Sequence, residues 1–200
     1  MNTEEKNTRI AFERSFNMGF GTETDVRDRD CQIVISHDMA NADAMSVENF
    51  FDIYKRNNQD LPLALNIKAD GLQVELARLL ARYEIKNYFV FDMAVPDGIL
   101  YARQGINTYT RHSEHEPQPA FYDLAHGVWL DEFNEHWLTD AAIEAHLAAK
   151  KSICIVSPEL HKRNHAKEWL HYSNLENKIG QDRMMLCTDF PEQAREFFNE

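Results

Sequence analysis

Short apolar runs alternate with amphipathic segments along most of the chain, and this alternation restricts the possible fold more than any other feature. The apolar runs have the length of buried strands and follow one another after roughly 20 to 30 residues, a spacing typical of βα units in a parallel sheet. The sequence therefore predicts an α/β fold. Expected strands lie at residues 61–68, 88–93, 106–111, 127–131, 152–156 and 184–187, and expected helices at 7–18, 46–57, 72–83, 139–150 and 192–198.

Polar or charged residues follow almost every expected strand at its carboxyl end. In a (β/α)8 barrel this edge of the sheet carries the active site. An open doubly wound sheet usually has a glycine-rich phosphate loop at its switch point, and the sequence contains neither a GxGxxG nor a Walker pattern. We therefore expect a (β/α)8 TIM-type barrel that spans residues 1–200 as a single domain. The strand-end residues are Glu23, Asp25, Asn66, Lys68, Asp92, Arg111, Glu114, Asp131, Glu159 and Asp189.

Two further β-type runs near the N-terminus flank a polar turn, which we place at residues 28–30. Glu23 and Asp25 lie two residues apart on the first run, so both carboxylates project from the same face of one strand. The second run passes through Ile33 and ends at His37, which is followed by Asp38. Paired acids beside a histidine at a strand end indicate a site of the metal or acid–base type.

Composition narrows the class of partner. The formal net charge of −12 argues against a broad nucleic-acid surface and against electrostatic docking on anionic lipid. Cys31, Cys154 and Cys187 have no metal-clip spacing, and we expect three reduced, buried thiols. No apolar run approaches the roughly 18 residues of a membrane span, and the first residues have no apolar leader core. We expect a cytoplasmic protein with a small-molecule partner, no nucleic-acid partner and no stable membrane insertion.

Five segments resemble the glycerophosphodiester phosphodiesterases of the phospholipase-C-like TIM-barrel superfamily. Their order and approximate spacing match the family over nearly the whole chain, and the first three together are the most specific. The last, with its Thr-Asp pair, would carry little weight alone. The matching segments are Asn7-Thr8 with Ala11-Phe12, GTETDV at 21–26, IVISHD at 33–38, LNIK at 65–68 and CTDFP at 187–191.

The resemblance implies hydrolysis of a phosphodiester, with glycerophosphodiesters as the substrate class. It places a divalent metal on Glu23 and Asp25 and makes His37 a general acid or base. Mg²⁺ or Ca²⁺ prefers carboxylate oxygens and would neutralise the charge of the phosphodiester, and histidine moves protons near neutral pH. Lys68, and in addition Arg27, could hold the phosphate oxygens.

The sequence departs from the family in two places. The family opens with a strand that ends in His-Arg-Gly, and no such strand precedes the Asn7-Thr8 match. We therefore expect a barrel that lacks its first strand, with another segment or chain in the gap and a homo-oligomer as one solution. The family's third metal carboxylate falls on Asn66, which offers a neutral carbonyl oxygen to the metal instead.

Two alternatives stay open. The first is a non-catalytic or impaired barrel that binds an anionic phosphorylated metabolite or a glycan phosphate, because one histidine and one carboxylate of the family pattern are missing. The second is a zinc site at His112, His115 and Glu116, although their spacing fits no tight tetrahedral motif. Metal-dependent phosphate binding without turnover would favour the first alternative.

Overall fold

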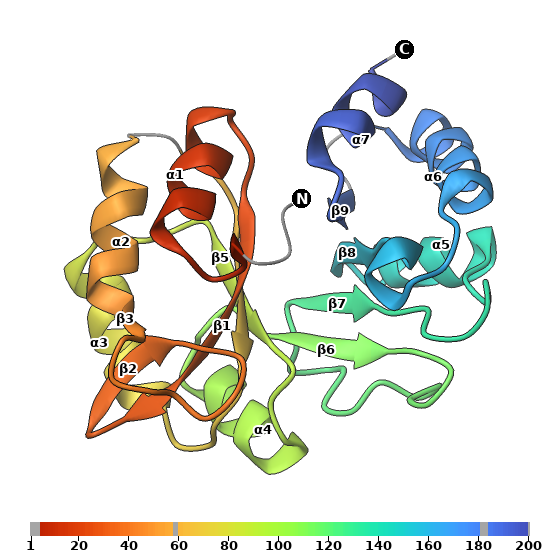
Figure 1. The fold of residues 1–200 in the computed structure, drawn as a ribbon. Helices are drawn as coiled ribbons and strands as arrows, with labels where there is room; N and C mark the ends of the chain where they lie inside the picture. The colour runs from red at the N-terminus through yellow and green to blue at the C-terminus, as the bar shows by residue number, and fades with distance from the viewer. Residues whose placement is uncertain (1–4, 58–59, 181–183, 200) are drawn as a thin grey trace. The chain divides into compact units, whose positions relative to one another are not determined.

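The computed structural model describes residues 5–57, 60–180 and 184–199, and within it the chain forms two compact α/β units, residues 2–108 and 109–200. Each unit is described by itself. In Figure 1 the first unit runs from red to green and the second from green to blue. Whether the two units act as the single domain predicted from the sequence stays a prediction.

The first unit contains a five-stranded sheet with the order β3-β2-β1-β4-β5. Strands β1, β4 and β5 are parallel, whereas β2 runs antiparallel to both β1 and β3. The elements are α1 (Arg9–Asn17), β1 (Thr22–Arg29), β2 (Gln32–Ile35), β3 (Met45–Ser46), α2 (Val47–Arg56), β4 (Leu63–Ile67), α3 (Gln73–Arg82), β5 (Tyr88–Phe91) and α4 (Val95–Arg103).

Local sequence signals explain the helix and strand ends of this unit. Thr8 caps α1 by accepting a hydrogen bond from the backbone N–H of Ala11, and Ser46 caps α2 in the same way. The β1–β2 turn consists of Asp30 and Cys31, whose φ angles of 48° and 63° suit a tight hairpin. The predicted turn at residues 28–30 is therefore wrong by about two residues, and Cys31 is exposed at the turn instead of buried.

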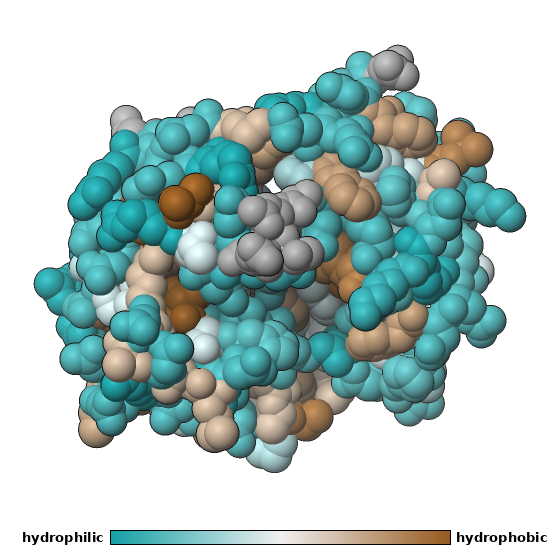
Figure 2. Space-filling model, in the orientation of Figure 1, coloured by the Kyte–Doolittle hydropathy of each residue, from teal (hydrophilic) through white to brown (hydrophobic). Residues whose placement is uncertain are grey.

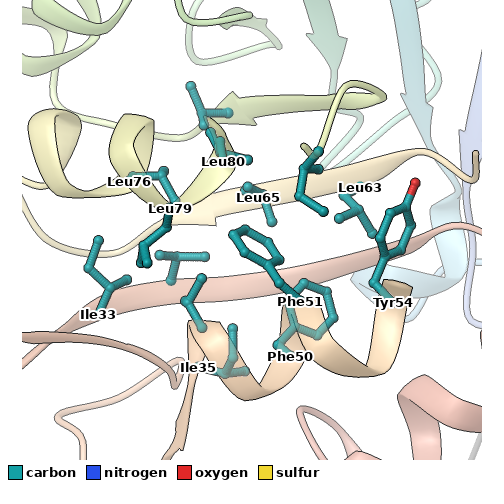
Figure 3. Packing of buried hydrophobic residues seen from close by; sticks show 14 of the residues in the cluster. Ile33, Ile35, Phe50, Phe51, Tyr54, Leu63, Leu65, Leu76, Leu79 and Leu80 are labelled. Carbon is teal, nitrogen blue, oxygen red and sulfur yellow. The ribbon is translucent and has the colours of Figure 1, made fainter. Parts of the chain in front are cut away.

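One face of the first sheet packs against the helices. Figure 3 shows Phe50 and Phe51 of α2 and the leucines of α3 against Ile35 of β2 and Leu65 of β4. Side chains alternate between the two faces of a strand, so the residues beside these apolar ones point to the opposite face. That opposite face carries Glu23 and Asp25 of β1 and Asn66 of β4.

The second unit contains a four-stranded parallel sheet with the order β6-β7-β8-β9. Val128, Leu130, Ile153 and Ile155 pack on one face with helical residues such as Trp169. Gly127 lies so close to β6 that an added Cβ would be 2.4 Å from the ring of Tyr109. The elements are β6 (Tyr109–His112), β7 (Gly127–Leu130), α5 (Asp140–Ala148), β8 (Ser152–Val156), a 3-10 turn (Pro158–His161), α6 (Ala166–Ile179), β9 (Met184–Cys187) and α7 (Pro191–Phe198).

The structure confirms the predicted alternation of strands and helices and the parallel pairing, and hence the α/β fold. Closure of the strands into a (β/α)8 barrel stays a prediction. Figure 2 shows hydrophilic residues over most of the visible face, with hydrophobic residues in small separate groups. None of the helices that the structure describes is long and apolar enough to cross a membrane.

Candidate active site

Strands β1 and β4 bring Glu23, Asp25 and Asn66 together on one face of the first sheet. Asp25 is the register partner of Asn66 in the parallel β1–β4 pair, and Glu23 precedes Asp25 by two residues on the same face. The sequence-based prediction that the two acids share a strand face is therefore confirmed. Thr24, which lies between them, points to the opposite face of the strand, toward the helices.

Lys68 supplies positive charge to this face. Its Nζ lies 3.6 Å from Asp25 Oδ1 and 3.2 Å from Asp92 Oδ2, and its side chain is only 19% exposed. Asp92 follows β5 with a φ of 72°. On the other side, Asn7 Nδ2 donates to Asp25 Oδ2 at 2.9 Å, while Asn7 Oδ1 accepts from the Thr24 hydroxyl at 2.8 Å. Asp25 is thus held from both sides.

Glu23 carries the most perturbed carboxyl of this group. The pKa of Glu23 is raised from 4.5 to about 7, mainly by burial and in addition by the negative charge of Asp25. A hydrogen bond from Asn66 and the positive charges of Lys68 and Lys6 act in the opposite direction. The protein therefore provides too little positive charge to keep Glu23 fully ionised at neutral pH.

The donor atoms of this face suit a hard divalent cation. Asn66 Oδ1 is buried and, among the residues that the structure describes, has no hydrogen-bond partner. An orphaned amide oxygen beside two carboxylates provides three oxygen donors, which Mg²⁺ and Ca²⁺ prefer. Within the described ranges, no group of three His, Cys, Asp or Glu side chains could hold a metal ion, so the third protein ligand would be the amide.

His37 is more exposed than these residues. Its side chain is 67% exposed, and its Nδ1 is 3.0 Å from Asp38 Oδ1. Arg27 donates to the backbone carbonyls of His37 (3.1 Å) and Lys68 (3.5 Å), so it connects the segments that carry these residues. The structure shows no hydrogen bond from the His37 imidazole to Glu23 or Asp25 within the described part of the chain.

Several other strand-end residues have structural roles. Glu114 accepts hydrogen bonds from the backbone N–H groups of residues 133–135, which lower the pKa of its carboxyl although burial acts against them. Glu159 accepts from Ser157, from Thr188 and from the backbone N–H of Asp189, and so joins the loops after β8 and β9.

The histidines considered as a zinc site have protein partners. His112 Nδ1 lies 3.0 Å from His146 Nε2, and His115 Nε2 lies 3.3 Å from Asn134 Nδ2. The described residues contain no metal-type cluster at this place. The hypothesis of a zinc site at His112, His115 and Glu116 therefore has no structural support.

The sequence reasoning missed one residue, His161. Its Nε2 lies 2.5 Å from Asp131 Oδ1, and Arg111 Nε lies 3.8 Å from Asp131 Oδ2. Burial raises the pKa of Asp131, although His161 and Arg111 act in the opposite direction. Glu159 and His161 both follow the expected strand at 152–156, but only Glu159 was predicted as a strand-end residue.

Comparison with known proteins identifies solved structures with a similar fold. No protein-family model and no curated protein matches the sequence. The structure is similar to a candidate glycerophosphodiester phosphodiesterase from Galdieria sulphuraria, with a TM-score of 0.72, 16% identity, and 94% of this chain and 91% of that chain covered. It is equally similar to a glycerophosphodiester phosphodiesterase from Agrobacterium tumefaciens str. C58, with a TM-score of 0.72, 12% identity, and 97% and 93% covered. This likeness confirms the mixed α/β fold that the sequence predicts and the resemblance to glycerophosphodiester phosphodiesterases at the level of the fold.

Proposed function

We propose that this chain is a metal-dependent phosphodiesterase of the glycerophosphodiester phosphodiesterase family, built as a TIM-type barrel and acting on a glycerophosphodiester-like substrate. The proposal rests on one observation above all: Glu23, Asp25 and Asn66 present three oxygens on one strand face of a fold shared with two such proteins. The motif match at residues 7–68 and at 187–191 supports it.

Glu23, Asp25 and Asn66 would hold Mg²⁺ or Ca²⁺. When bound, the cation supplies the positive charge that stabilises the phosphodiester as water attacks. Its charge would also favour the ionised form of Glu23, whose pKa the protein alone raises to about 7.

Lys68 and His37 have the remaining roles in this proposal. Lys68 donates to a phosphate oxygen from a position beside the carboxylates of Asp25 and Asp92. In hydrolysis the water oxygen bonds to phosphorus, the phosphorus–oxygen bond to the alcohol breaks, the water loses a proton, and the departing alkoxide gains one. The exposed imidazole of His37 carries one of these two protons.

Thermal unfolding and hydrolysis, measured on the same preparations, test the proposal. We expect Mg²⁺ or Ca²⁺ to raise the melting temperature and to support cleavage of bis(4-nitrophenyl) phosphate and of a glycerophosphodiester, and EDTA to reverse both effects. Glu23→Gln and Asp25→Asn should remove the metal-induced shift and lower cleavage by about 100-fold or more. Asp28→Asn changes an exposed acid of the same strand and should behave as the wild type. If Glu23→Gln and His37→Gln both retain full activity, the assignment fails.

A second candidate is a non-catalytic protein that binds a phosphorylated metabolite or glycan phosphate at the same residues. The His37 imidazole is 67% exposed and paired with Asp38, and this favours the second candidate. It predicts metal-dependent binding of a phosphodiester, measured by calorimetry, without any product after prolonged incubation. Product formation that depends on Glu23 would exclude it.

A further inference from the structure

Arg111, Asp131 and His161 come together within the second unit, at the carboxyl ends of its parallel strands. Arg111 belongs to β6, Asp131 follows β7 directly, and His161 ends the 3-10 turn after β8. Ligands of α/β proteins bind outside the carboxyl ends of the strands, because loops there can differ without disturbing the sheet. The cluster therefore lies at an edge of the sheet where a ligand site is expected.

Asp131 forms the buried base of the cluster. The residue is 4% exposed, and its carboxylate has His161 Nε2 at 2.5 Å, Arg111 Nε at 3.8 Å and a hydrogen bond from Trp129. A buried carboxylate with these partners has a fixed orientation. It can therefore act as an anchor for His161.

His161 has one nitrogen bound and one nitrogen open. The Asp131 carboxylate accepts a hydrogen bond from His161 Nε2. The neutral imidazole therefore carries its hydrogen on Nε2 and its lone pair on Nδ1. Across the described ranges, Nδ1 has no hydrogen-bond partner, and the side chain is 22% exposed. The ring of Phe133, with its centroid 4.6 Å from that of the imidazole, supports the orientation.

A nearby histidine shows what a purely structural role looks like. His136 uses both ring nitrogens, with Nδ1 2.8 Å from the fully buried Glu132 and Nε2 2.9 Å from His171 Nδ1. Glu132 in turn accepts from the Tyr172 hydroxyl and from the backbone N–H of Leu138. The Asp131–His161 pair is oriented in the same manner, but within the described ranges His161 uses only one of its ring nitrogens.

Arg111 contributes a positive charge to the cluster, because it approaches the same carboxylate and the same Phe133 ring as His161. Its side chain is 25% exposed, its guanidinium lies 5.6 Å from the centroid of Phe133, and Glu116 Oε2 is 3.6 Å from its Nε. The Glu116 side chain is 41% exposed, so this ion pair is weak and a stronger anion can displace it. Arginine binds phosphate oxygens better than any other side chain, because its planar fork donates two parallel hydrogen bonds.

We propose that Arg111, Asp131 and His161 form a ligand site within the second unit, which binds inorganic phosphate. Arg111 holds the anionic oxygens, and His161 Nδ1 accepts a hydrogen bond from the remaining P–OH group. A carboxylate or sulfate is ionised at neutral pH and has no hydroxyl to donate, so the site selects phosphate by its proton as well as by its charge. All three residues belong to the second unit.

Chemical modification of His161 tests the site directly. Diethyl pyrocarbonate acylates an accessible unprotonated imidazole nitrogen, and mass spectrometry of peptides reports each histidine separately. With a Kd near 1 mM, about 10 mM phosphate should slow the modification of His161 roughly tenfold, while sulfate at equal ionic strength should not. The exposed His126 is the internal reference and should react at the same rate throughout.

Three variants complete the design. Arg111→Gln should abolish the protection by phosphate, Arg78→Gln at an exposed arginine of α3 should not, and Glu116→Gln should increase the protection, because the competing carboxylate is gone. Circular dichroism establishes that each variant is folded, and calorimetric titration of the wild type with phosphate needs no variant at all. Equal protection by sulfate, protection that survives in Arg111→Gln, or no binding in either wild-type experiment overturns the proposal. All measurements are made in EDTA, both on the wild type and on Glu23→Gln. The test of phosphate binding therefore gives a result even if the proposed metal-dependent function is wrong.

Discussion

The buried His146 should make the second unit sensitive to mild acid. Its Nδ1 lies 2.8 Å from the Tyr122 hydroxyl and its Nε2 lies 3.0 Å from His112 Nδ1, so both ring nitrogens are used by the neutral imidazole. Burial lowers the pKa of His146 from 6.5 to about 4, and the charges of His112 and Lys151 contribute to this decrease. Protonation would turn the accepting nitrogen into a donor and leave a buried charge without compensation.

The size of the effect follows from the two pKa values. Because the pKa of the folded state is lower than that of the unfolded state, the contribution to stability is complete above pH 6.5 and is lost as the pH falls toward 4. Between pH 7 and pH 5 the unfolded imidazole takes up a proton that the folded one does not. The free energy of unfolding of this unit should therefore decrease by about 2 kcal/mol over that interval from His146 alone.

Urea unfolding at pH 5, 6 and 7 measures this difference. Tryptophan fluorescence is a specific probe, because Trp129, Trp137 and Trp169 all belong to the second unit. His146→Gln keeps a side chain that can donate and accept but cannot be protonated, so its stability should fall about 2 kcal/mol less than that of the wild type between pH 7 and 5. The exposed His126→Gln should retain the wild-type slope. Identical slopes for His146→Gln and the wild type would refute the reasoning.

Three further changes test the packing and the metal site. Asn7→Ala removes the side chain that positions Asp25, and we expect the metal concentration for half-maximal hydrolysis to rise by about 10- to 100-fold, with the melting temperature as the control for a general loss of structure. Gly127→Ala places a Cβ 2.4 Å from the Tyr109 ring and should lower the free energy of unfolding of the second unit by about 1–3 kcal/mol in tryptophan-monitored urea titrations. Leu65→Ala opens a cavity at a fully buried position of the first core and should cost about 2–5 kcal/mol, measured by circular dichroism; a loss below about 1 kcal/mol would show that this core is loosely packed.

Local patterns in the sequence predicted most of the fold. The apolar periods located the strands β4 to β9 and the helices α3 and α5, and Ser46 and Thr139 cap α2 and α5. The pairing of Asp25 with Asn66 follows from the parallel register of β1 and β4. The hairpin turn was misplaced because Asp28 and Arg29 have turn-like composition, whereas the positive φ angles fall on Asp30 and Cys31.

The orientation of side chains beyond the strand ends could not be predicted. Strand β2 ends at Ile35, so no sheet periodicity determines where the His37 imidazole points. After β8 the chain enters a 3-10 turn that ends with Lys162 at a φ of 60°, and this turn directs His161 toward Asp131. A sequence pattern shows that polar residues follow a strand, but the loop geometry selects which of them meet.

The charge on the β1–β4 face connects its structure to the proposed chemistry. Lys68 now lies between Asp25 and Asp92 and partly neutralises both, while Glu23 keeps a raised pKa. A third acid in place of Asn66 would add to the mutual repulsion that raises this pKa, whereas the amide provides an oxygen without a charge. A cation bound at Glu23 and Asp25 would take over the neutralising role of Lys68 and leave its ammonium free to hold a phosphate oxygen. Metal and substrate binding should therefore be mutually favourable, and this coupling depends on the lysine.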